Sequence, residues 1–183
     1  MQLLLLRSAF VCCSALVGIA AWWINGHVFA NYEVAQGVNL IYWPHGLRVV
    51  LTLLFERYAV IGLIGGSFFV AQLTWPGDPI MCFGTPFVSG SSAYFAQRYI
   101  LGKSDHAQSR LVGLTPANLI ALGTLSALIN AAGHTLLRIG SGTRGPHADI
   151  FASMLAGDLL GALLFLYALK AILWISDQRS LPK

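Results

Sequence analysis

Charged residues are scarce in this chain. Asp, Glu, Lys and Arg together make up 10% of its 183 residues, whereas hydrophobic residues make up 56%. A soluble domain contains about 25% charged residues, so this composition excludes a soluble protein and predicts an integral membrane protein. A membrane-spanning helix needs about 20 apolar residues, so the chain has room for about six or seven crossings and for no separate soluble domain.

Cysteine is also rare, and the few cysteines show no functional spacing. Cys12 and Cys13 are adjacent, and Cys82 lies far from both. We interpret them as small packing residues, with palmitoylation or a redox role as alternatives. Neither the cysteines nor the histidines have metal-ligand spacing, so we predict no metal and no cofactor. The chain also lacks a recognisable nucleophile and base pair, a carboxylate pair and a Gly-rich phosphate loop, so we do not expect an enzyme.

The positive charges are scattered and form no basic stripe. The formal net charge is +4, but Lys and Arg lie at the ends of apolar segments, so we predict no nucleic-acid partner. The N-terminal apolar segment could be read as a signal peptide. However, Leu3 to Leu6 precede Arg7 instead of following it, which favours a retained helix. Trp22 and Trp23 would then lie at the membrane interface.

Apolar runs between polar or turn-forming breaks define six predicted membrane helices. Thr115 and Pro116 suit a helix start, with Thr as the cap and Pro in the first turn. We therefore predict an all-α bundle of about six transmembrane helices that forms one domain, 1–183. The predicted segments are Leu3–Ile24, Val38–Phe55, Tyr58–Trp75, Ile80–Leu101, Leu114–Leu137 and Ile150–Trp174.

The distribution of Lys and Arg predicts the orientation, because cytoplasmic loops carry the excess of these residues. Arg138 and Arg144 would be outside, and the segment Asn25–Gly37 and the loop Trp75–Pro79 contain no Lys or Arg. Both termini are therefore predicted to be cytoplasmic, in a multi-pass protein of the bacterial inner membrane. The residues predicted to lie on the cytoplasmic side are Arg7, Arg57, Arg98, Lys103, Arg110, Lys170, Arg179 and Lys183.

Two charged residues lie inside predicted membrane helices, where a charge is costly and usually has a function. From the helical rise, Arg48 would lie about 15 Å and Asp158 about 12 Å from the outer surface. His45 shares a helix face with Arg48, and Asn130 and His134 are spaced by four residues in the fifth segment. We predict that these five residues line a ligand-binding pocket in the outer half of the bundle that takes a small solute, with an anion among the candidates.

Structural explanations for the same residues stay open. Arg48 and Asp158 could neutralise each other as an ion pair, because a lone buried charge costs more than a paired one. Asn130 and His134 could instead join helices through hydrogen bonds, which are worth about 0.6 kcal/mol each in membranes. In both cases the residues would hold the bundle together and need not contact a ligand.

The glycines predict close packing between helices, and a proline predicts a break in the second helix. Gly157 and Gly161 form a small-xxx-small face that lets another helix approach, and Gly62, Gly65 and Gly66 could do the same in the third segment. In the run Tyr42-Trp43-Pro44-His45-Gly46-Leu47-Arg48, Pro44 removes a backbone donor, so the second helix is expected to be kinked or to begin there. A broken helix beside an arginine is a common form of membrane-embedded anion site.

Two of these motifs together resemble the first class of bacterial membrane-associated sensor domains. The run Asn39 to Arg48 is similar to that family's W-P-x-G signature, and Ala156-Gly157-Asp158-Leu159-Leu160-Gly161 to the G-D-x-x-G element of its last helix. The resemblance covers about 38–174. It puts signature positions at Trp43, Pro44, Gly46, Gly157, Asp158 and Gly161. It implies a multi-helix sensory module, a type usually joined to a histidine kinase or a diguanylate cyclase.

No output domain follows the last segment in this sequence, so a sensor of this kind would signal through a partner protein. We therefore expect a sensory or regulatory module that binds a small solute and passes a shift of its last helix to a membrane or cytoplasmic partner or to another copy of itself. A small transporter, or the substrate-binding subunit of one, is the first alternative. A structural or assembly subunit of a larger membrane complex is the second.

Overall fold

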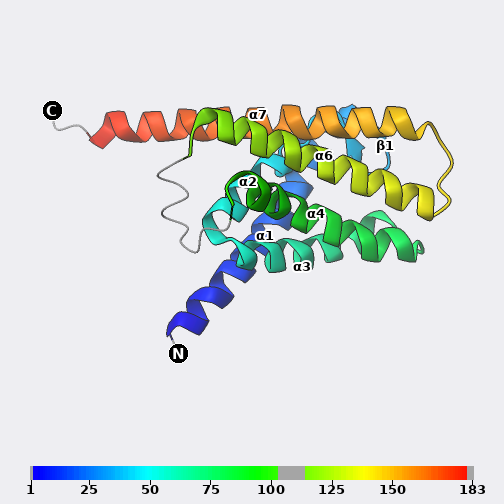
Figure 1. Cartoon of the computed structure of the whole chain (residues 1–183), viewed down its shortest axis with the longest axis horizontal. Coiled ribbons are helices and arrows are strands. Elements are labelled where there is room, and N and C mark those ends of the chain that lie inside the picture. The colour runs from blue at the N-terminus through cyan, green and yellow to red at the C-terminus, as the bar shows by residue number, and fades with distance from the viewer. Residues whose placement is uncertain (1, 103–113, 181–183) are drawn as a thin grey trace.

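The fold is an all-α bundle with one small hairpin (Figure 1). The structure is a computed structural model that describes residues 2–102 and 114–180, with side chains up to residue 168. Within these residues there are six α-helices, a short 3-10 helix and two strands. Their bounds are α1 Gln2–Val28, η1 Ala30–Tyr32, β1 Glu33–Ala35, β2 Val38–Asn39, α2 Pro44–Phe55, α3 Arg57–Thr74, α4 Pro79–Ile100, α6 Pro116–Gly140 and α7 His147–Ser180.

Four of these helices, α1, α3, α6 and α7, are long and apolar enough to cross a membrane. Large apolar side chains are exposed around the bundle; Leu16, Phe69, Phe87 and Leu136 are each more than half exposed. Soluble monomers rarely expose apolar surface on this scale, because it would remain in contact with water. The helical content and the exposed apolar surface agree with the composition.

Different parts of the chain lie at the two ends of the bundle. In Figure 1 both chain termini lie at the left, whereas the loop between α3 and α4 and the loop between α6 and α7 lie at the right. We call the right-hand side the hairpin end, because the loop of the β1–β2 hairpin and both of these loops line one groove there.

α2 is the central helix and contacts all five of the other described helices. Lys103, Arg110 and Lys183, which entered the predicted orientation, lie outside the described residues.

Two predicted helix starts are confirmed. The Thr115 side chain accepts a hydrogen bond from the backbone N–H of Asn118 at 3.1 Å, and Pro116 is the first residue of α6. α2 begins at Pro44, as the proline predicted. In both helices the proline lies in the first turn. An N–H group there would have no acceptor within the helix, so its absence in proline costs no hydrogen bond.

The second predicted crossing is wrong as a continuous helix. α2 has 12 residues, so it is about 18 Å long and cannot span a hydrocarbon core of about 30 Å. The first part of the predicted segment is instead strand β2, paired antiparallel with β1, and a non-helical run that leads to Trp43, whose backbone is already in the right-handed helical region. The physical reason is the proline, which prevents helix from continuing toward the N-terminus.

The extended segment 39–43 lies directly on α7. A Cβ atom at Gly157 would overlap the Asn39 carbonyl oxygen, and one at Gly161 would overlap the Tyr42 carbonyl group. The predicted small-residue face therefore exists, but the chain that packs against both glycines is extended and not helical. Next to Gly161 on α7, a Cβ at Gly46 of α2 would lie 2.9 Å from the Ala162 Cα, and one turn further along it would lie 2.8 Å from the Phe165 Cβ.

The α1–α3 contact also depends on glycine. A Cβ at Gly62 would overlap the Val11 carbonyl oxygen, and one at Gly66 would lie 2.8 Å from the Ala15 carbonyl oxygen. Gly65 has no atom within 4 Å of its Cβ position, so the prediction that it also packs against a neighbouring helix is wrong. The 3.6-residue helical period explains this, because Gly62 and Gly66 share one face and Gly65 does not.

We expect Gly157→Ala to destabilise the protein by about 1–3 kcal/mol, because the added methyl group forces segment 39–43 away from α7. Gly65→Ala is the matched control, since it has open space and alanine favours helix by about 1 kcal/mol. Thermal unfolding of both variants in detergent measures the difference. Equal melting temperatures for Gly157→Ala and the unmodified protein would contradict the close contact.

Candidate functional site

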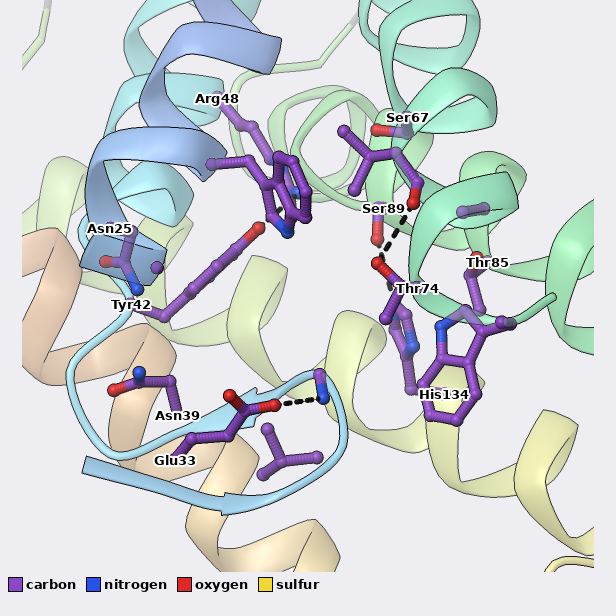
Figure 2. Close-up of a pocket in the computed structure, with 17 residues that line it drawn as sticks. Asn25, Glu33, Asn39, Tyr42, Arg48, Ser67, Thr74, Thr85, Ser89 and His134 are labelled. Atoms are coloured by element: carbon purple, nitrogen blue, oxygen red, sulfur yellow. Dashed lines mark hydrogen bonds between the residues drawn. The ribbon is translucent and has the colours of Figure 1, made fainter. Parts of the chain in front are cut away.

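A cavity of about 110 Å³ lies in the half of the bundle nearer the hairpin end. α1, the hairpin, the extended segment, α2, α3, α4 and α6 all contribute to its wall. In Figure 2 the side chains of Asn25 and Tyr42 approach it from one side, and those of Ser89 and His134 from the other. Seven described elements thus enclose one polar space within an otherwise apolar bundle.

Arg48 provides the positive charge in this cavity. Its Nη2 donates a hydrogen bond to the Tyr42 hydroxyl at 3.0 Å, and its guanidinium carbon lies 5.2 Å from the centre of the Tyr42 ring. Tyr42 reaches Arg48 because it belongs to the extended segment and not to a helix continuous with α2. Among the described residues no carboxylate forms an ion pair with Arg48.

A second, smaller cavity of about 40 Å³ extends the first toward α7. The two cavities share Tyr42, Arg48, Ser89 and His134 in their walls. Asn130 and Asp158 line only the smaller one. The two cavities therefore adjoin at the shared residues, and Arg48 and Asp158 both line the smaller one.

Asp158 is 1% exposed and has partners on two helices. The Asn130 side-chain amide of α6 donates a hydrogen bond to its Oδ2 at 2.7 Å, and His45 Nδ1 of α2 lies 3.5 Å from the same oxygen. The direct ion pair with Arg48, which the sequence left open as an alternative, does not form among the described residues. Because α2 begins at Pro44, His45 lies in its first turn and faces α7, while Arg48 is bonded by Tyr42.

The structure brings the predicted ligand-binding residues together. Arg48, Asn130, His134 and Asp158 line the smaller cavity, and His45 lies beside Asp158 without lining either cavity. Whether these residues bind a ligand stays a prediction.

The hydroxyl groups near the cavity differ in role. Ser89 Oγ lies 2.8 Å from His134 Nε2, which joins α4 to α6 across the cavity wall. This bond agrees with the interhelical role considered for His134. Gln72, a polar residue of α3, is exposed and lines neither cavity.

The motif residues pack against one another. The Trp43 ring stacks on the Phe165 ring of α7 with 6.0 Å between centroids and 14° between planes. The backbone N–H of Tyr42 donates to the Gly157 carbonyl oxygen at 3.0 Å. The two short motifs, far apart in the chain, thus meet at one contact.

Several cavity and anchoring residues were missed by the sequence patterns. Asn25 and Tyr42 line the larger cavity, and Trp22 joins them although it was predicted to be only an interface residue. Arg138 is 3% exposed; its Nη2 donates to the Gln36 carbonyl oxygen and its guanidinium carbon lies 4.8 Å from the Trp75 ring centre. Each lies near the end of an apolar run, where hydropathy does not distinguish a buried anchor from a surface residue.

No group of three or more His, Cys, Asp or Glu residues in the described part of the chain could hold a metal ion. No protein-family model, curated protein or solved structure matches the chain. The resemblance to sensor domains therefore stays a prediction based on the two motifs.

We expect Asn130→Ala to lower the free energy of unfolding by about 1–3 kcal/mol, because it removes a donor from buried Asp158. Ser126→Ala is the control, since the Ser126 hydroxyl lies one turn earlier on the same face, is buried and has no hydrogen-bond partner. Thermal unfolding in detergent should show a drop of roughly 2–10 °C for the first variant only. Equal drops for both variants would contradict a specific role for the Asn130 bond.

Proposed function

We propose that this protein is a bacterial inner-membrane sensory or regulatory module that binds a small anionic solute beside Arg48. The observation that carries the proposal is the half-buried guanidinium in the cavity wall, whose side-chain partner is the neutral Tyr42 hydroxyl. A guanidinium has five N–H donors in a planar fork that matches carboxylates and oxyanions. The Tyr42 bond uses one of the five, which leaves donors for a ligand.

The cavity limits the size of the solute. A cavity of about 150 Å³ holds one benzene molecule with its six carbon atoms, so about 110 Å³ accommodates a solute of roughly four or five heavy atoms. Small carboxylates and inorganic oxyanions fall in this range. Tyr42, Ser89 and His134 add polar groups around Arg48 that could orient such a solute.

The proposed orientation places the hairpin end outside the cell. Arg7 and Arg57 are exposed near the opposite end, where the positive-inside rule puts the cytoplasm. In this orientation the chain from β2 to the end of α2 forms one crossing, with an extended outer part and a helical inner part. Non-helical backbone at membrane depth is tolerated where protein buries it, as α7 does here.

The extended segment offers a route from the cavity to α7. Tyr42 is bonded to Arg48 through its hydroxyl and to the Gly157 carbonyl through its backbone N–H. A solute that draws Arg48 away from Tyr42 would change how segment 39–43 lies on α7. Such a solute shifts the protein only if it binds one arrangement more tightly than the other. The moved α7 would then act on a partner protein or on another copy of the chain.

A transporter is the second candidate, and one observation favours it. Many transporters place their substrate at a break in a membrane helix, and the second crossing here breaks beside the cavity. Uptake of a bound solute into proteoliposomes would support transport, whereas binding without uptake would support the sensory function.

We expect Arg48→Gln to weaken binding of acetate, propionate or inorganic phosphate at least tenfold, because it removes the cation from the cavity. Arg57→Gln is the matched control, since Arg57 is exposed at the far side of the bundle. Titration calorimetry on protein in nanodiscs measures the dissociation constants. Equal binding by Arg48→Gln would overturn the proposal, as would failure of the unmodified protein to bind any of these anions or any other small carboxylate, amino acids included.

A further inference from the structure

Two opposite charges face one small cavity without forming an ion pair. Arg48 and Asp158 both line the cavity of about 40 Å³, yet Arg48 is hydrogen-bonded to Tyr42 and Asp158 to Asn130, with His45 Nδ1 3.5 Å from the Asp158 carboxylate. Opposite charges in a low-dielectric interior attract strongly, so a fold that keeps them apart leaves each available to a third group.

The Asp158 side of this cavity is arranged to accept hydrogen bonds. Asn130 uses its side-chain amide nitrogen to donate to Asp158, so its carbonyl oxygen is left over. That oxygen is buried and has no hydrogen-bond partner, although Asn130 is only 3% exposed. A buried acceptor without a donor costs about 1–3 kcal/mol, which a ligand with N–H donors would recover. An ammonium group carries three such donors.

Simple ions fit this pair of charges less well. An anion at Arg48 would face the Asp158 carboxylate, and a cation at Asp158 would face the Arg48 guanidinium. A solute with one charge of each sign complements both groups at once.

We propose that the solute is a small zwitterion of the amino-acid type, an inference that rests on the proposed binding function. Its carboxylate would lie at Arg48 and Tyr42, and its ammonium group at Asp158 and the Asn130 carbonyl oxygen. A solute that occupies both adjoining cavities, about 110 and 40 Å³, would have about the size of glycine or alanine. His45 would act as a positioning residue that holds the Asp158 carboxylate from the other side.

Titration calorimetry in nanodiscs at pH 7 tests the proposal with three probes of similar size: alanine, propionate and ethylamine. We expect alanine to bind the unmodified protein at least tenfold more tightly than either of the others. In Asp158→Asn that advantage over propionate should be lost, because the acceptor for the ammonium group is weakened. Asp149→Asn is the matched control, since Asp149 is an exposed acid in the first turn of the same helix and should keep the advantage.

The outcomes separate this inference from the proposed function. Propionate that binds as tightly as alanine would overturn the zwitterion and leave the anion site standing. Failure of alanine, propionate, acetate and phosphate to bind would overturn both. The comparison of the three probes on the unmodified protein decides the matter even where Asp158→Asn does not fold.

Discussion

The contact between segment 39–43 and α7 is the constraint on which the rest of the structure depends. Gly157 and Gly161 lack the Cβ atoms that would overlap the carbonyl groups of this segment, so extended backbone lies directly on helical backbone. Asp158 follows Gly157 immediately and therefore enters the interior beside α2 and α6. Without this contact Tyr42 would not reach Arg48, and the cavity would lose one of its walls.

An extended chain inside an apolar bundle must have its backbone polar groups satisfied, because an unpaired buried group costs free energy. Three consecutive N–H groups meet this requirement in different ways. That of Leu40 donates to the Tyr32 carbonyl, that of Ile41 to the Asn39 side chain and that of Tyr42 to the Gly157 carbonyl. Pro44, two residues after Tyr42, has no N–H group that needs an acceptor. The 3-10 turn, the hairpin and α7 thus satisfy backbone groups that the interruption of the second helix would otherwise leave unpaired.

The same arrangement connects the cavity to α7, the helix that would move in the proposed sensory function. Arg48, Tyr42 and Gly157 form a chain of contacts that runs from the cavity to the backbone of α7. Arg138 anchors the hairpin at its other side through Gln36 and Trp75. Segment 39–43 is thus held between a fixed hairpin and a helix, so a change at Arg48 would act on α7 more readily than on the hairpin.

The sequence by itself determined the all-α class, the positions of most of the described helices, the start of α2 at Pro44, the Thr115 cap of α6 and part of the set of polar residues that enter the interior. Hydropathy and helix signals are local, so they carry this information. Tertiary structure decided which of those residues meet. It paired Asp158 with Asn130 and His45 and not with Arg48, replaced half a helix by extended chain, and left Gly65 without a neighbour. These outcomes depend on the approach of segments far apart in the chain, which no local pattern encodes.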